Sequence, residues 1–102
     1  MNLYTKSRDG VLYEANADYT AGVVIVKKGS KINRQLSNAV KSRKAIAELI
    51  ADDSLFENQN YLKNDIRFTS LSTAATFVTG RIANGNIVWK TEDGKYVKYS
   101  LQ

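Results

Sequence analysis

The order of apolar and polar positions predicts short strands in the first part of the chain. Residues 3–8 and 11–17 are rich in strand-forming residues, and Asp9-Gly10 between them is typical of a tight β-hairpin turn. Residues 22–28, GVVIVKK, are β-branched and nearly continuous. This run predicts a buried central strand that ends at Gly29-Ser30.

Residues 36–51 have the spacing of three and four that places apolar side chains on one face of a helix. The predicted face consists of Leu36, Ala39, Val40, Ile46, Ala47 and Ile50. Ser37 is the expected N-cap, because its hydroxyl can accept a hydrogen bond from the first turn. The sequence therefore predicts one helix over this range.

A second helix is predicted to begin after a cap at Thr69 or Ser70. Its apolar positions, at intervals of three, four and seven, are Leu71, Ala74, Ala75 and Val78. The alanines allow the helix backbone to approach a sheet closely. Gly80 follows at the position where a left-handed residue ends a helix.

The end of the chain is predicted to form a hairpin. Asn84-Gly85 favours a turn with positive φ, and residues 92–94 form a second turn between strands at 86–90 and 95–101. Trp89 is expected in the core, and the alternative is an exposed ring that stacks on a base. The elements together predict an α+β fold in a single domain of residues 1–102. We expect an antiparallel or mixed sheet of about five to seven short strands with two helices packed on it.

Composition argues against most enzyme chemistry. The chain has 102 residues, 43% of them apolar, and contains neither cysteine nor histidine. It therefore lacks thiolate ligands, the commonest general base and the commonest metal ligand. The adjacent acids Asp52-Asp53 and Glu92-Asp93 lie in predicted turns and have no partner base nearby in sequence. We expect a non-catalytic protein with no cofactor and no metal.

No apolar run approaches the length of about 20 residues that spans a bilayer. The first ten residues lack a basic start followed by an apolar core, so no signal peptide is expected. A cytoplasmic protein without membrane partners is the resulting expectation.

Positive charge is concentrated in one segment. The net charge is +5, and no acidic residue occurs between Asp18 and Glu48. The basic residues of that interval are Lys27, Lys28, Lys31, Arg34, Lys41, Arg43 and Lys44. Gathered cations repel one another unless a polyanion neutralises them, so this set is the candidate nucleic-acid-binding surface. A plain solvated face is the alternative, and it stays open because few aromatic residues accompany the charges.

A second candidate lies at the start of the helix after residue 70. Ser70, Ser72 and Arg81 are a candidate anion site, because helix N-termini offer free N–H groups and a positive partial charge. The structural alternative is that Ser70 only caps the helix. Arg81 and Lys90 are also expected to extend the basic surface if this helix lies on the same face.

Motifs along most of the chain carry a resemblance. The strand end Lys28-Gly29-Ser30 is the first of them. The later ones are Phe68, Ser70, Ser72, Ala74, Ala75, Gly80, Asn84, Gly85, Trp89, Lys90, Asp93 and Gly94. With these motifs, residues 3–96 resemble a small uncharacterised family. Its members occur as stand-alone chains, as C-terminal modules of GIY-YIG nuclease-like proteins, and in proteins associated with restriction and modification.

Two departures from the family pattern stand out. Leu71 replaces the proline of a Ser-Pro-Ser helix start, and Asn86 replaces the aromatic residue that usually follows Asn-Gly. If that aromatic residue binds a ligand, this chain lacks the contact. The resemblance implies a setting in nucleic-acid processing and no particular activity.

Two functions follow as expectations. The first is an accessory module that binds DNA or RNA weakly through phosphate contacts, with little sequence readout. The second is a protein-interaction or structural module that docks on a nuclease, on a methyltransferase or on itself. Exposed apolar side chains around Phe56, Tyr61, Tyr96 and Tyr99 would favour the second.

Overall fold

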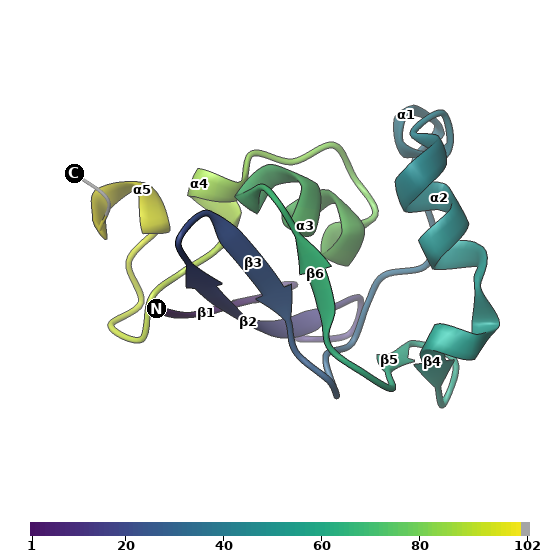
Figure 1. Ribbon diagram of the computed structural model, residues 1–102, viewed down its shortest axis with the longest axis horizontal. Helices are drawn as coiled ribbons and strands as arrows, with labels where there is room; N and C mark the ends of the chain where they lie inside the picture. Colours follow the sequence, from purple (N-terminus) through teal and green to yellow (C-terminus); the bar gives the residue numbers. More distant parts are fainter. Residues whose placement is uncertain (101–102) are drawn as a thin grey trace.

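One layer of strands and one layer of short helices make up the α+β fold of the computed structural model, which describes residues 1–100 (Figure 1). The strands are β1 Asn2–Lys6, β2 Glu14–Thr20, β3 Val23–Val26, β4 Phe56–Glu57, β5 Tyr61–Leu62 and β6 Ile66–Phe68. The helices are α1 Asn38–Lys41, α2 Lys44–Ala51, α3 Leu71–Thr79, α4 Gly85–Val88 and α5 Val97–Ser100, with a 3-10 turn, η1, at Asp53–Leu55.

The main sheet has four strands in the order β1-β2-β3-β6, and every neighbouring pair is antiparallel. Strands β4 and β5 form a separate two-stranded sheet. The α+β class is as predicted, but the main sheet has fewer strands than the expected five to seven, and the described part of the chain has five helices instead of two.

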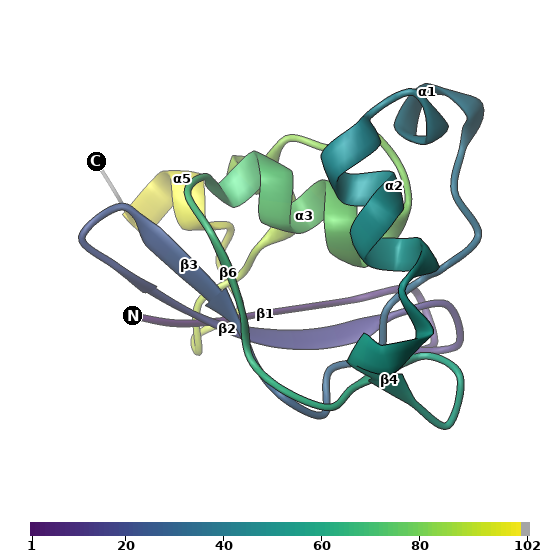
Figure 2. The same ribbon diagram turned by 45° about the vertical axis from the view of Figure 1, so that its right-hand side comes forward.

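The helices cover one face of the main sheet (Figure 2). Leu3 of β1, Ala17 of β2 and Val26 of β3 lie in register across the strands, and all three are buried under the helices. The next row across the sheet, formed by Asp18, Ile25 and Arg67, points to the other face, because side chains alternate along a strand. The predicted central strand is confirmed, since β3 lies between β2 and β6 and both Val24 and Val26 are fully buried.

The β1–β2 hairpin is confirmed, but its turn is wider than the two residues predicted. Residues 7–13 connect the strands, and Gly10 adopts a positive φ of 75°. The hydroxyl of Ser7 accepts hydrogen bonds from the N–H groups of Leu12 and Tyr13, at 3.1 and 3.3 Å. This buried hydroxyl provides the acceptor for N–H groups of the longer loop. A two-residue turn would not need such a side-chain acceptor.

Helix α3 forms as predicted. The Ser70 hydroxyl accepts a hydrogen bond from the Thr73 N–H at 3.0 Å, and Gly80 ends the helix in the left-handed region with φ 73°. Ala74 and Ala75 have no exposed surface. Small side chains at these two positions let α3 lie directly on the sheet.

The predicted helix over 36–51 is two helices, α1 and α2, separated at Ser42 and Arg43. The Ser42 hydroxyl donates to the Ala39 carbonyl at 2.7 Å, so a side chain competes for a backbone acceptor at the break. Of the predicted buried face, Val40, Ile46 and Ile50 are buried, Leu36 and Ala47 are half-buried, and Ala39 is exposed. Ser37 caps α1 as expected.

Within residues 1–100 the predicted C-terminal hairpin forms only at its turn, where Lys90 and Tyr96 make one antiparallel bridge, and the two predicted strands are wrong. Asn84 caps helix α4 through its side chain, which accepts from the Asn86 N–H at 3.0 Å, and φ at Asn84 is −89°. Residues 97–100 form helix α5 instead of a strand, and Leu101 of the predicted strand lies outside the described residues. An Asn-Gly pair suits a helix start as well as a turn, and tertiary contacts decide between them.

Those contacts fix α4 against the start of α3. A Cβ on Gly85 would lie 2.3 Å from the carbonyl carbon of Leu71, so the two backbones touch. The Gly85 N–H donates to the Ser72 hydroxyl at 3.0 Å, and Trp89 Nε1–H donates to the Leu71 carbonyl at 3.1 Å. Trp89 is completely buried, as predicted.

Arg34 fastens the C-terminal end of α2 to the rest of the molecule. Its guanidinium donates to the Ile50 carbonyl at 3.0 and 2.7 Å and to the Gln59 carbonyl at 2.6 Å. It also pairs with Asp53 at 2.6 Å and lies 4.1 Å from the centre of the Phe56 ring. A cation at this place is also favourable for the helix dipole of α2.

Gly85→Ala is expected to lower the free energy of unfolding by about 3 kcal/mol, because an added methyl group overlaps the Leu71 backbone. Urea unfolding followed by the fluorescence of the single, buried Trp89 measures the loss. Asn86→Ala is the control, since Asn86 is exposed on the same helix and its loss should change stability by less than about 0.5 kcal/mol. Equal stability of G85A and N86A would contradict the close α3–α4 contact.

Arg34→Lys is expected to cost about 2 kcal/mol, because an ammonium group cannot span two carbonyls and a carboxylate as the planar guanidinium does. Arg43→Lys is the matched control, since Arg43 is exposed and has no side-chain cap bond. Thermal unfolding of both variants, with amide exchange in α2, measures the effect. An R34K chain with parental stability and protection of α2 would show that the carbonyl bonds contribute little.

Candidate functional site

Three exposed cations lie at the junction of helices α1 and α2. Lys41 ends α1, Arg43 precedes α2, and Lys44 is its first residue. Within residues 1–100 none of the three forms an ion pair. We call these residues the α1–α2 cluster.

The main chain adds to the positive field of this cluster. Arg43 at the N-cap position makes no side-chain cap bond, and the first turn of α2 contains no acidic residue. The first N–H groups of a helix have no intrahelical acceptor, so they are left for water or an anion. Three cations and these N–H groups together can bind a phosphate group.

The other residues of the predicted basic surface lie elsewhere. Lys27 and Lys28 follow β3, at the opposite end of the connection that leads to α1 (Figure 1). Lys31 is half-buried and exchanges two backbone hydrogen bonds with Glu14, at 3.0 and 2.8 Å. The guanidinium of Arg34 is engaged by carbonyl groups and Asp53. The basic segment is therefore divided in space.

Asp65 partly neutralises the charge at the end of β3. Its carboxylate accepts a hydrogen bond from the Lys28 N–H at 2.7 Å and lies 3.5 Å from Lys27 Nζ. The backbone hydrogen bond is the main cause that holds the pKa of Asp65 below its usual value, and the Lys27 charge contributes. Lys27 and Lys28 thus meet an acid that lies far from them in the sequence.

The predicted anion site does not assemble. Ser70 caps the start of α3, and the Ser72 hydroxyl accepts the Gly85 N–H. Arg81 follows the other end of this nine-residue helix, roughly 13 Å away along its axis. Arg81 lies instead beside the start of α1, because the preceding Gly80 carbonyl accepts the Ser37 N–H at 2.9 Å.

A hollow along the outer edge of β1 brings together residues that are distant in sequence. We call it the β1-edge groove; it has a volume of about 360 Å³. Its aromatic and charged lining consists of Tyr4, Lys6, Arg8, Tyr13, Lys90 and Tyr96. No acidic residue lines it. Sequence reasoning considered Lys90 and Tyr96 singly and missed the set, because its members come from both ends of the chain.

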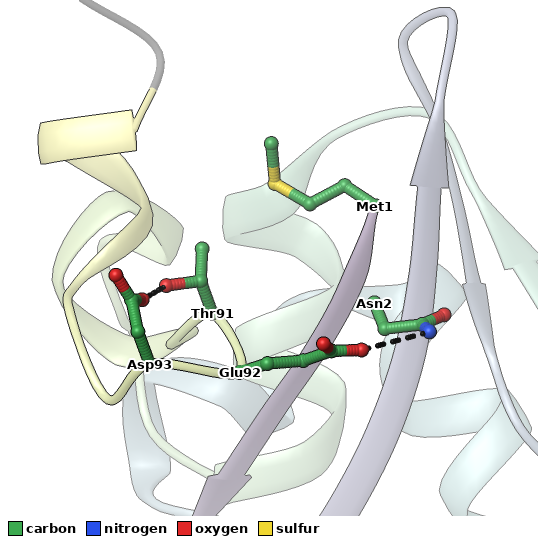
Figure 3. Close-up of a pocket in the computed structure, with 5 residues that line it drawn as sticks. All are labelled: Met1, Asn2, Thr91, Glu92 and Asp93. Atoms are coloured by element: carbon green, nitrogen blue, oxygen red, sulfur yellow. Dashed lines mark hydrogen bonds between the residues drawn. The ribbon is translucent and has the colours of Figure 1, made fainter.

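A larger hollow has the opposite character (Figure 3). Its volume is about 610 Å³, and Glu92 and Asp93 lie in its wall with Met1, Asn2 and Thr91. Asn2 Nδ2 donates to Glu92 at 3.2 Å, and the Thr91 hydroxyl donates to Asp93 and lowers the pKa of that carboxyl. Two carboxylates and no Lys or Arg side chain in the wall disfavour phosphate binding here.

The exposed tyrosines agree only in part with the apolar surface expected for protein docking. Tyr61, Tyr96 and Tyr99 are exposed, whereas Phe56 is buried beneath Arg34. Among residues 1–100 no three Asp, Glu, His or Cys side chains come close enough to hold a metal ion. No helix in that range is both long and apolar enough to cross a membrane.

Comparison with known proteins places the chain in a family. Searches of curated proteins and of solved structures give no match. A family model described as a domain of unknown function matches residues 3–100, which is nearly the whole chain. The protein therefore belongs to the DUF4357 family.

Proposed function

We propose that this protein is a non-catalytic module that binds the phosphate backbone of nucleic acid through the α1–α2 cluster. The observation that carries the proposal is the uncapped start of α2, where Arg43 and Lys44 lie, with Lys41 at the end of the preceding helix. Phosphate contacts position a protein on nucleic acid without reading its sequence. The binding is therefore weak, sensitive to salt and tolerant of sequence.

Neighbouring cations add to this surface. Arg81 is exposed and lies next to the residues that cap α1, so it extends the positive face. Lys27 and Lys28 supply a second, weaker contact region whose charge Asp65 reduces. Arg34 contributes through its structural role, because it holds the α2 helix that carries the cluster.

The biological setting of the proposal rests on the family resemblance. Relatives that occur with nuclease-like and restriction-modification proteins favour a role in nucleic-acid processing. In that setting a module with weak phosphate affinity raises the local concentration of an enzyme on DNA or RNA. The enzyme partner would be a nuclease or a methyltransferase, and the chain itself would do no chemistry.

A protein-docking module is the second candidate. Tyr96, Ile87 and Tyr99 are 40%, 48% and 57% exposed, which is a large fraction for such side chains. Aromatic residues are enriched at the centres of protein interfaces. A partner that covers these side chains would compete with the nucleic-acid proposal only if it also contacts the α1–α2 cluster.

Lys44→Glu is expected to weaken binding of a short labelled duplex and to reduce its salt dependence. If three phosphates are contacted, the slope of log K against log salt is about −3, and removal of one contact flattens it by about one unit. Fluorescence anisotropy at several salt concentrations measures both quantities.

Lys63→Glu is the matched control, because it changes net charge by the same amount and Lys63 is exposed in the turn between β5 and β6. It should leave the slope close to the parental value. Equal losses in K44E and K63E would mean that net charge, and not the α1–α2 cluster, determines binding. Failure of the parent to bind at low salt would overturn the proposed function.

A further inference from the structure

We infer that the β1-edge groove is a second binding site that accepts unpaired nucleotides, with bases on its tyrosines and phosphates on its cations. The inference rests on the proposed function and specifies its ligand as single-stranded nucleic acid. The juxtaposition of Tyr4, Tyr13 and Tyr96 with Lys6, Arg8 and Lys90 carries it.

The charge of the groove selects an anionic ligand. Its lining has three cations and no acid. Glu14 is the cross-strand neighbour of Lys6, but it lies outside the lining and forms no ion pair with Lys6 among the described residues. A strand of phosphates therefore complements this surface along its length.

The tyrosines favour a polyanion that carries bases, because their rings can stack on them. Sites for single-stranded nucleic acid combine a basic groove with aromatic rings on which bases stack. Tyr96 is 40% exposed, and its ring lies 5.2 Å from Lys90 Nζ, so a stacking surface and a cation are adjacent. The basic segment of residues 27–44 has no comparable aromatic accompaniment.

Hydrogen bonds hold the walls of the groove in place before any ligand arrives. Tyr4 and Lys90 exchange two backbone hydrogen bonds, each of 2.9 Å, which fix the Lys90–Tyr96 segment along β1. On the other side, Ser7 holds the loop that carries Arg8 and Tyr13. A preformed site loses less conformational freedom on binding.

The edge of β1 also offers polar groups to a base. Because Tyr4 directs its N–H and C=O outward to Lys90, alternation along the strand directs those of Lys6 to the same edge. These groups can donate to and accept from the Watson–Crick edge of a base, which is free only when the base is unpaired. The volume of about 360 Å³ lies at the small end of ligand sites, which suits a few unpaired nucleotides better than a duplex.

The experiment compares four probes: labelled oligothymidylate, oligouridylate, a short duplex, and polyphosphate, which has charge but no bases. Tyr96→Ala is expected to weaken oligothymidylate or oligouridylate binding about tenfold, the effect of one lost stacking contact. It should leave polyphosphate and duplex binding unchanged. Tyr96→Phe, which keeps the ring, should bind as the parent does.

Tyr99→Ala is the matched control, because Tyr99 is exposed on α5 and does not line the groove. Arg8→Gln is a second test, because it removes a cation of the groove and leaves both Tyr96 and the backbone hydrogen bonds of the walls intact. It should weaken the binding of single strands. Unchanged oligothymidylate and oligouridylate binding in both Y96A and R8Q would overturn the inference. The inference would also be overturned if an oligoglutamate peptide bound in a Tyr96-dependent way and neither oligonucleotide did. That result would identify an acidic protein segment as the ligand of the groove.

The outcomes separate this inference from the proposed function. Duplex binding that depends on Lys44, with Y96A and R8Q equal to the parent on single strands, would support the α1–α2 cluster as a binding surface. The same result would overturn the groove as a binding site. Binding of single strands that depends on Tyr96 and not on Lys44 would support the groove as a binding site and overturn the α1–α2 cluster as one. Absence of binding to every nucleic-acid probe would overturn both.

Discussion

The guanidinium of Arg34 is the interaction on which the placement of the functional surface depends. It joins the last turn of α2, the Gln59 carbonyl and Asp53 while it lies over the Phe56 ring. The ion pair alone contributes little, because Asp53 is 91% exposed. The two bonds to the Ile50 carbonyl are partly buried and satisfy an acceptor that the end of a helix leaves open. A cation that the sequence assigned to a binding surface therefore holds the end of α2 in place.

Two segments outside the main sheet help to form the two candidate surfaces. Between β3 and β6 the chain leaves the sheet and builds α1, α2 and the small β4–β5 sheet, and this excursion carries the α1–α2 cluster (Figure 2). After α3 the chain returns along the outer edge of β1, where Lys90 pairs with Tyr4. The return pairs with that edge at Tyr4, and the groove lies beside this contact. The α1–α2 cluster thus lies outside the main sheet, whereas the groove lies between the returning chain and the edge strand β1.

Local signals predicted α3 in full because each of them acts within a few residues. Ser70 bonds the N–H three residues later, and Gly80 is left-handed at the end of the same helix. The failure at Asn84-Gly85 has a different cause. That pair fits a hairpin turn and a helix start about equally, and the backbone of Leu71, distant in sequence, decides the outcome. The same reason separates the seven predicted cations, since Asp53 and Asp65 approach them only in the folded chain.

By itself the sequence determined the α+β class, the buried β3 strand, the α3 helix, the core position of Trp89 and the acid-free basic segment. Each follows from side-chain periodicity, capping or composition, which are properties of neighbouring residues. The tertiary structure alone decided that α1 and α2 are separate, that Arg34 is structural and that tyrosines from residues 4 to 13 meet Lys90 and Tyr96. These features depend on contacts between segments far apart along the chain, and no local pattern encodes which distant groups will meet.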